Sequence, residues 1–349
     1  MTFRDRLVVG KRAAFGVAAA GAALLVGATA PQAVAVTAFS PSAPAGFSVR
    51  TIATAPAGLS EPDDVTRLGG HLFVAYQNGV GSKGEAAKTG GIHSAVVEYT
   101  LGGKTLHRWN MIGKIDGMTA DRAHRRIVAT VNEDGNSSLY TIDRGGVQHY
   151  QYEPAPLPHG GGTDSVAFVH GRMFVTASAP SADANGTTYS KPALYQVTLR
   201  GKTAHATPVF FDNAAATDLH TGQQSRLNLS DPDSGMRVPG CVPTVGNRFL
   251  LDSQGDSQLV FIRQLGTKHS SASVLNLDHQ VDDTAFATSN SGTLYVVDNQ
   301  DNRILAVQGG FHRGEAFSST TGGTVGRLNL TTGTITPFIT GLGSPHGLL

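Results

Sequence analysis

The chain has 349 residues, of which 40% are hydrophobic and 15% charged, with 43 glycines and one cysteine. This apolar content excludes a mainly disordered chain, and glycine without a three-residue period excludes collagen. Because 27 basic residues stand against 26 acidic ones, no basic field is present to hold nucleic acid. The single cysteine, Cys241, excludes an internal disulfide and a multi-cysteine metal site.

The first 35 residues have the order of a secretory signal peptide: a basic start, an apolar stretch and a small-residue cleavage site. Residues 13–30 are almost wholly small and apolar, and Ala33-Val34-Ala35 offers the preferred cleavage site. The alternative is an N-terminal membrane anchor, because about 18 apolar residues are marginally long enough to span a bilayer. We expect cleavage, secretion to the extracellular space or cell envelope, and a single mature domain of residues 36–349 without membrane association.

Short runs in the mature chain alternate apolar and polar residues and are rich in β-branched and aromatic side chains, which predicts strands. Five such runs lie at residues 71–76, 126–131, 172–177, 248–252 and 293–298. Each follows a shorter predicted strand that starts at an aspartate, and we expect each run to pair with the strand directly before it. No stretch of 12 or more residues has a helical period with capping residues.

The aspartates at these strand starts recur about every 50 residues, at Asp64, Asp116, Asp164, Asp233 and Asp283. A four-stranded unit repeated at this interval is typical of a β-propeller blade. Residues 47–63 resemble residues 335–346, so we expect the two chain ends to share a closing blade. The prediction is an all-β propeller with six blade positions, five complete and the closing one abbreviated. A five-bladed propeller and a β-sandwich are the alternatives.

Three short motifs resemble known propeller repeats. Residues 116–121 (DGMTAD) resemble the repeat element of SMP-30/gluconolactonase-like and NHL-type propellers, and residues 344–348 (SPHGL) resemble it in a weaker form. Residues 298–304 (DNQDNRI) are similar to a turn of NHL repeats. The resemblance implies one divalent cation, usually calcium or zinc, held at the mouth of an axial channel by a glutamate, asparagines and an aspartate.

The resemblance also assigns roles to individual residues. Asp116 matches the family's aspartate, which implies a metal ligand that also acts as the catalytic base. Glu61 stands where the family's glutamate would lie, although the glycine expected after it is absent. Asn78 and Asn132, which follow two predicted strands, are the nearest matches to the asparagine ligands.

The inner strands of a propeller begin near its axis, so the residues at their starts converge at one end of the channel. Carboxylates gathered in a small space either rise in pKa or bind a cation, and a loose ring of oxygen ligands suits Ca²⁺ better than Zn²⁺. The alternative is that each aspartate only accepts hydrogen bonds from its own turn. The candidate metal ligands are Glu61, Asp64, Asp116, Asp164 and Asp283.

Residues at strand starts and in polar turns form a second candidate set, for ligand binding at the channel mouth. These residues are Asn132, Glu133, Asp233, Asp252, Asp298, Asn299 and His346. Long insertions at residues 79–93, 180–191 and 309–323, with a further excursion at 213–227, are expected to enlarge one face of the ring.

Two functions remain open from the sequence. The first is an extracellular binding or scaffold module, monomeric, that takes a small molecule, glycan or peptide at the channel mouth or the loop-rich face. The second is a calcium-assisted lactone or ester hydrolase in which Asp116 is the catalytic carboxylate. One divalent cation, Ca²⁺ in preference, is the only cofactor expected. Neither G-x-S-x-G nor H-E-x-x-H occurs, so whether the chain is an enzyme stays open.

Overall fold

The computed structural model describes residues 40–349, and these residues form an almost entirely β structure. Twenty-six strands, β1 to β26, are accompanied by one short 3-10 helix, Gln254–Asp256. Across residues 40–349 we find no helix with the length and apolar character needed to cross a membrane. The predicted signal peptide, residues 1–35, lies outside the described residues.

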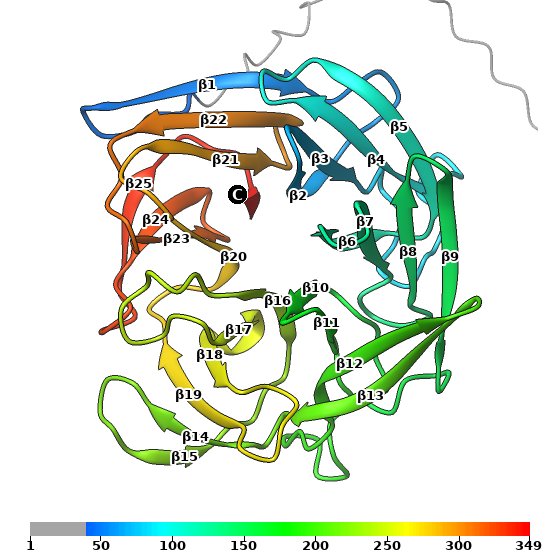
Figure 1. Ribbon diagram of the computed structural model, residues 1–349, viewed down its shortest axis with the longest axis vertical. Helices are drawn as coiled ribbons and strands as arrows, with labels where there is room; N and C mark the ends of the chain where they lie inside the picture. Colours follow the sequence, from blue (N-terminus) through cyan, green and yellow to red (C-terminus); the bar gives the residue numbers. More distant parts are fainter. Residues whose placement is uncertain (1–39) are drawn as a thin grey trace, which may run out of the picture. The chain divides into compact units, whose positions relative to one another are not determined.

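Antiparallel ladders group the strands into four-stranded units, each with one strand near the centre of Figure 1. The first unit consists of β2 (Pro62–Leu68), β3 (His71–Tyr76), β4 (His93–Thr100) and β5 (Thr105–Ile112). The second consists of β6 (Ile115–Asp121), β7 (Arg126–Val131), β8 (Ser138–Asp143) and β9 (Gly146–Glu153). The third consists of β10 (Val166–Val169), β11 (Arg172–Thr176), β12 (Pro192–Arg200) and β13 (Thr203–Phe211).

The later units follow the same antiparallel pattern. The fourth consists of β16 (Pro232–Arg237), β17 (Phe249–Ser253), β18 (Gln258–Arg263) and β19 (Ser271–Asn276). The fifth consists of β20 (Val281–Phe286), β23 (Ala316–Thr320), β24 (Thr324–Leu328) and β25 (Ile335–Ile339). The closing sheet consists of β26 (Pro345–Leu348), β21 (Gly292–Asp298), β22 (Arg303–Gly309) and β1 (Phe47–Thr54).

The central strands of these units contact one another in a closed circuit. β2 contacts β6 and β26, β10 contacts β6 and β16, and β20 contacts β16 and β26. Sheets arranged around a common centre in this way form a β-propeller, so the predicted all-β propeller is confirmed (Figure 1). A parallel pairing of β9 with β13 joins the second and third units into one eight-stranded sheet. The number of hydrogen-bonded sheets therefore differs from the number of four-stranded units. The expected count of six blades, with five as the alternative, stays a prediction.

The order of strands in the last two sheets differs from the prediction. We expected the strand at residues 282–285 to pair with the run at 293–298, but β20 pairs with β23, while β21 pairs with β22 and β26. The β21–β22 hairpin has both faces buried: Val296 and Leu305 pack toward β20 and its sheet, and Val297 and Ile304 pack toward β2 and its sheet. This two-sided burial, which no local pattern specifies, overrides the nearest-neighbour pairing.

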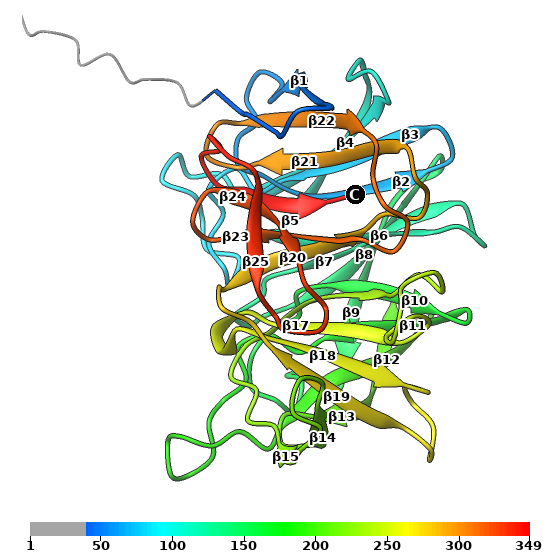
Figure 2. The same cartoon turned by 90° about the vertical axis from the view of Figure 1, so that its left-hand side faces the viewer.

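The first and last described strands both lie in the closing sheet, as expected, with β1 at its outer edge and β26 at the centre. Figure 2 shows β1, β22 and β21 running side by side. This sheet has four strands and is not abbreviated, because β21 and β22 complete it. β21 and β22 thus supply the two strands that the expected abbreviated blade lacked.

Two of the predicted insertions are loops, at residues 79–92 between β3 and β4 and at 177–191 between β11 and β12. The expected insertion at 309–323 instead contains β23, and the excursion at 213–227 contains β14 (Ala215–Asp218) and β15 (Gln224–Arg226). β14 pairs in parallel with β19 and extends the fourth unit outward.

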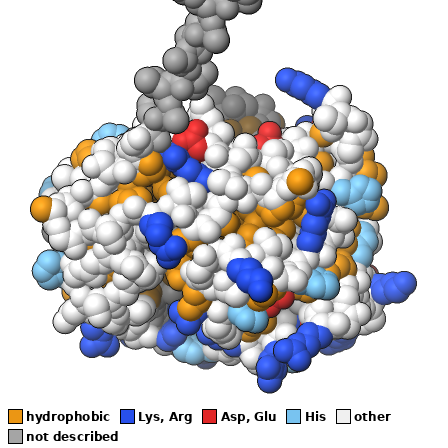
Figure 3. Space-filling model, turned by 90° about the horizontal axis from the view of Figure 1, so that it is seen from above, with side chains coloured by type: hydrophobic (Ala, Val, Ile, Leu, Met, Phe, Trp, Pro, Cys, Tyr) orange, Lys and Arg blue, Asp and Glu red, His pale blue; other side chains and the backbone are white. Residues whose placement is uncertain are grey.

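Apolar side chains fill the spaces between adjacent sheets, in clusters that each draw residues from neighbouring units. One blade alone could not form such a core, because both faces of its sheet must be covered by neighbouring sheets. On the side of the ring in Figure 3, basic and histidine side chains are scattered and acidic ones are few. The acidic residues gather elsewhere, at the channel.

Candidate functional site

The starts of the inner strands share one backbone irregularity. The pairing of β2 with β3 shifts register between Pro62 and Val65, and equivalent shifts occur in β6, β16 and β20. A β-bulge of this kind redirects side chains at the end of a ladder. All the residues at the equivalent position line one cavity of about 1120 Å³. We call them the mouth ring: Asp63, Asp116, Asp164, Asp233, Asp282 and His346.

Two predicted metal ligands, Asp64 and Asp283, lie one residue past this ring and bind backbone amides. Asp64 Oδ1 accepts a hydrogen bond from the N–H of Val65 (2.6 Å), and Oδ2 accepts one from Met118 on the neighbouring strand β6 (2.5 Å). Asp283 Oδ2 accepts the N–H of Leu348 on β26 in the same manner (2.7 Å). These contacts match the alternative prediction, in which the aspartates at strand starts accept hydrogen bonds from the backbone.

His346 supplies one positive charge to the ring. Its Nδ1 lies 3.0 Å from Asp63 Oδ1 and 3.4 Å from Asp282 Oδ1. Burial lowers the pKa of His346, but the carboxylates of Asp282 and Asp63 outweigh it and raise that pKa to about 10. Gln254 also donates to Asp282 Oδ1 (3.3 Å). His346 is therefore a charged bridge between two ring carboxylates.

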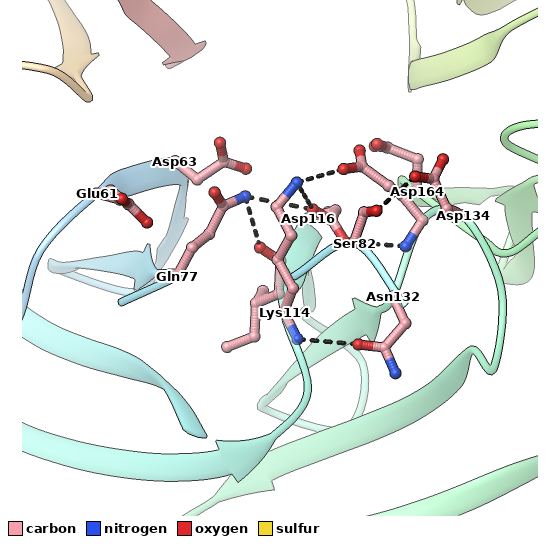
Figure 4. Close-up of polar contacts among 12 residues, drawn as sticks. Glu61, Asp63, Gln77, Ser82, Lys114, Asp116, Asn132, Asp134 and Asp164 are labelled. Carbon is pink, nitrogen blue, oxygen red and sulfur yellow. Dashed lines mark hydrogen bonds and ion pairs between the residues drawn. The ribbon is translucent and has the colours of Figure 1, made fainter. Parts of the chain in front are cut away.

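Lys114 supplies the second positive charge (Figure 4). Its Nζ lies 3.0 Å from Asp116 Oδ1 and also contacts Glu133 Oε1. Burial opposes its charge, but Asp116 and Glu133 raise its pKa above the usual value. Asp116 further accepts hydrogen bonds from Gln77 Nε2 (3.2 Å) and from the backbone N–H of Glu133 (3.2 Å). Asp116, the predicted catalytic base, is thus held by three donors.

Asp164 and Asp233 are the ring members without a basic partner. Neither takes part in a salt bridge among residues 40–349, although one oxygen of Asp164 lies within 4.8 Å of one of Asp233. Burial, followed by the charge of Asp164, raises the pKa of Asp233, and burial also raises the pKa of Asp164. One oxygen each of Glu133, Asp164 and Asp233 lies within 4.8 Å of the others. This trio we call the acidic trio.

Three residues to which the family resemblance assigns a metal-binding role instead accept hydrogen bonds from backbone N–H groups. Glu61 Oε2 accepts the N–H of Gly79 (2.6 Å), and Glu61 lies apart from the contacts of Lys114 in Figure 4. Asn132 Oδ1 accepts the N–H of Lys114 (2.9 Å), and Asn78 Oδ1 accepts another backbone amide. Both asparagines have positive φ, 58° for Asn78 and 68° for Asn132, which asparagine tolerates better than most residues. None of the three lines the cavity.

The predicted ligand-binding residues Asp298 and Asn299 also lie outside the cavity lining. Asp298 Oδ1 accepts the backbone N–H groups of Gly343 (3.1 Å) and Ser344 (2.9 Å), and Oδ2 pairs with Arg303 (2.7 Å). The backbone N–H of Asn299 donates to the carbonyl of Ser344 (2.8 Å). This turn fastens the last strand of the chain to β21.

Asp252, also predicted at the mouth, is fully buried in β17, and neither carboxylate oxygen has a hydrogen-bond partner within residues 40–349. It points from the same face of β17 as Leu250, which packs with Val281 of β20. Burial, followed by the charges of Asp282 and Asp283, raises its pKa well above the usual value. Asp252 therefore lies behind the ring, in the joint with β20.

Four residues of the site escaped the sequence analysis: Asp63, Asp282, Lys114 and Gln77. Asp63 and Asp282 precede Asp64 and Asp283 directly, and the bulge gives the two carboxylates of each doublet different partners, His346 for the first and a backbone N–H for the second. The doublets themselves were the available signal. Lys114 and Gln77 occur in one unit each, so no repeat marks them.

No family model and no curated protein matches this chain. Among solved structures, one similar chain is a protein from Lactobacillus plantarum, with 12% identity, a TM-score of 0.42, and coverage of 83% of this chain and 88% of the other. Another is the periplasmic gluconolactonase PpgL of Pseudomonas aeruginosa, with 11% identity, a TM-score of 0.42, and coverage of 82% and 87%. At such low identity, function has to be inferred from the site itself.

Proposed function

We propose that the protein is a secreted binding module that holds one divalent cation, Ca²⁺ in preference, with Glu133, Asp164 and Asp233. Through this cation it takes an oxygen-rich small molecule or glycan at the channel mouth. The single observation that carries the proposal is the approach of these three carboxylate oxygens to within 4.8 Å of one another. Ca²⁺ binds oxygen at 2.3–2.6 Å, so two ligands on opposite sides of the ion lie about 5 Å apart.

The charge distribution supports this position over others in the ring. His346 offsets the charge of Asp63 and Asp282, and Lys114 offsets that of Asp116 and also contacts Glu133 of the acidic trio. Within the mouth ring only Asp164 and Asp233 have no basic partner, and burial raises the pKa of both. A divalent cation would favour both carboxylates in their charged form.

The donor chemistry fits a hard cation. The acidic trio offers carboxylate oxygens alone, without the imidazole or thiolate that would favour zinc. Three residues provide fewer than the six to eight oxygens that Ca²⁺ takes, so the remaining positions would be open to hydroxyl or carboxylate groups of a ligand. The adjoining cavity of about 1120 Å³ is large enough to hold a small molecule or a short glycan.

A calcium-assisted lactone or ester hydrolase, the activity that the family resemblance implies, is the second candidate. The proximity of Asp164 and Asp233 favours it, because two neighbouring carboxyl groups whose pKa values are raised by burial are suited to general acid–base catalysis. In this case the pair would act in place of Asp116, which Lys114 and Gln77 already bind. A lactone-opening assay of the wild type and of Asp164→Asn separates the two candidates.

The experiment that tests the cation site is thermal unfolding of the mature protein in Ca²⁺ and in chelator. Binding to the folded state alone stabilises it by about 2.7 kcal/mol when free Ca²⁺ is 100 times Kd. We expect this gain in the wild type and its loss in Asp233→Asn, which keeps the side-chain shape. The control is Asp143→Asn, at an exposed turn. Equal melting in Ca²⁺ and chelator for the wild type would overturn the proposal.

A further inference from the structure

The cavity continues along the axis past the mouth ring to a second set of residues. Four positions after each ring aspartate, the inner strands place another side chain on the same cavity. At roughly 3.3 Å per residue, this second level lies about 13 Å further along the strands. We call it the far ring: Arg67, Ala120, Phe168, Arg237 and Phe286.

The two levels are separated by an apolar segment. Two positions after the mouth ring, the cavity is lined by Val65, Met118, Val166 and Leu348, from four different strands. Thr284 on β20 and Gly235 on β16 stand at the same level, so this segment is mainly rather than wholly apolar. The channel therefore has an acidic end, a mainly apolar middle and a far end of different character.

The far end carries positive charge that no acidic residue offsets by direct contact. Among residues 40–349, neither Arg67 nor Arg237 forms a salt bridge. Arg67 Nε donates to the carbonyl of Gly69 (3.1 Å), and Arg237 donates to the side-chain oxygen of Asn247 (2.7 Å). Both acceptors are neutral, so each guanidinium keeps its full charge and its remaining donors.

Asp121, an acidic residue that lines the cavity at the end of β6, is already paired. Its carboxylate accepts from Arg126 Nε (2.9 Å) and contacts His124 Nδ1 (2.7 Å). Arg122, on the turn after β6, also lines the cavity and forms no salt bridge in the described part of the chain. An anion entering this end would meet arginines without displacing an existing ion pair.

Two aromatic side chains complete the far ring. Phe168 on β10 and Phe286 on β20 are half-buried and line the cavity, with Arg237 on the strand between them in the ring order. Neither ring stacks on another aromatic ring among residues 40–349. A flat apolar ligand would cover surface that is now open to the cavity.

We propose that the far ring is a second binding site, for an anionic group carried on an aromatic or similarly flat apolar body, such as an aryl carboxylate. The phenyl groups of Phe168 and Phe286 take the body, and Arg237, on the strand between them, takes the anion. Arginine suits this task because its planar fork binds a carboxylate through two parallel hydrogen bonds. The site is independent of the cation proposed at the mouth.

Calorimetric titration of the mature protein with 2-naphthoate tests this proposal. Arg237→Gln keeps an exposed polar side chain and should fold normally, and its loss of a charge-assisted contact should weaken binding about tenfold. Phe286→Leu should weaken binding by a smaller factor while leaving an apolar surface. Arg200→Gln, an exposed arginine away from the cavity, is the matched control and should bind as the wild type does.

The results for the arginine variant, the amine and sulfate decide the matter. Weaker binding in Arg237→Gln, with no binding of 2-naphthylmethylamine to the wild type, supports the site. Equal binding of the amine, or naphthoate binding unchanged in Arg237→Gln, overturns it. Asp233→Asn should bind naphthoate like the wild type, so failure of the cation site leaves this result unaffected. Binding of sulfate as tightly as naphthoate would also contradict the proposal, since it would remove the role of the phenylalanines.

Discussion

The carboxylate of Asp64 on β2 accepts the backbone N–H of Met118 on β6, so one side chain joins two neighbouring inner strands. Asp283 repeats this contact with Leu348 on β26. In both joints the aspartate lies in the β-bulge, directly after a mouth-ring residue. The bulge therefore turns one carboxylate of each doublet toward His346 and the next toward the backbone of the neighbouring inner strand.

Asp64→Ala should destabilise the protein without affecting cation binding. The substitution leaves the N–H groups of Val65 and Met118 without their acceptor, which costs about 1–3 kcal/mol. Urea unfolding measures the loss, and calcium titration of the same variant should give the wild-type stoichiometry. Loss of Ca²⁺ binding with unchanged stability would contradict the assignment of Asp64 to the joint.

Asp252→Ser should have the opposite effect on stability. Asp252 is fully buried without a hydrogen-bond partner, while the equivalent positions of other units carry Thr130, Thr176 and Ser319, whose hydroxyls accept a bulge N–H. Removing an unsatisfied carboxyl should raise the free energy of unfolding by about 1–3 kcal/mol at pH 7.

The gain should depend on pH in a defined direction. Burial and nearby carboxylates raise the pKa of Asp252 in the folded state, so the wild type loses stability as pH rises above the unfolded value of about 3.9. Denaturant unfolding at pH 4 and pH 8 should therefore show the larger gain for Asp252→Ser at pH 8. A gain that is equal at both values, or a loss, contradicts this account.

His346 provides a second pH-dependent contribution, over a different range. Because its folded pKa is raised from the usual 6.5 to about 10, its pairing with Asp63 and Asp282 stabilises fully below pH 6.5 and is lost as pH rises through 10. The difference in unfolding free energy between the wild type and His346→Gln should shrink from pH 6 to pH 10. A constant difference would show that His346 is neutral in the folded protein.

The first 35 residues give a prediction that depends on sequence alone. If they act as a signal peptide, the exported protein should begin at Val36, after Ala35. Intact-mass measurement of protein from the culture medium or cell envelope checks this start. A full-length chain retained in the membrane would favour the anchor alternative.

The repeat architecture was predictable because it rests on local signals. Alternating apolar runs and recurrent aspartates mark the strands and their spacing, and the matching ends predicted that β1 and β26 share a sheet. The pairing of β21 with β22 and β26, in place of β20, was not predictable. It depends on two-sided packing of residues such as Val296 and Val297 against different neighbours, and this packing is a property of the assembled ring.

The residue types of the site were predictable, but their exact positions along the inner strands were not. Asp64 and Asp283 line the same cavity as Asp164, Asp233 and His346, but they bind backbone N–H groups, and Asp63 and Asp282 pair with His346 instead. A one-residue bulge decides between the members of each doublet, and the sequence of a doublet is the same in either register. Lys114 could not be predicted for another reason. Its role in the site depends on its contacts with Asp116 and Glu133, which exist only in the folded protein.

The most direct test of the central claim is a crystal structure of the mature protein soaked with Tb³⁺, an oxygen-seeking substitute for Ca²⁺, with anomalous scattering used to place the ion. The proposed function predicts one strong peak bounded by Glu133, Asp164 and Asp233. The absence of a peak there, or a peak beside Glu61 or Asp64 instead, would contradict it.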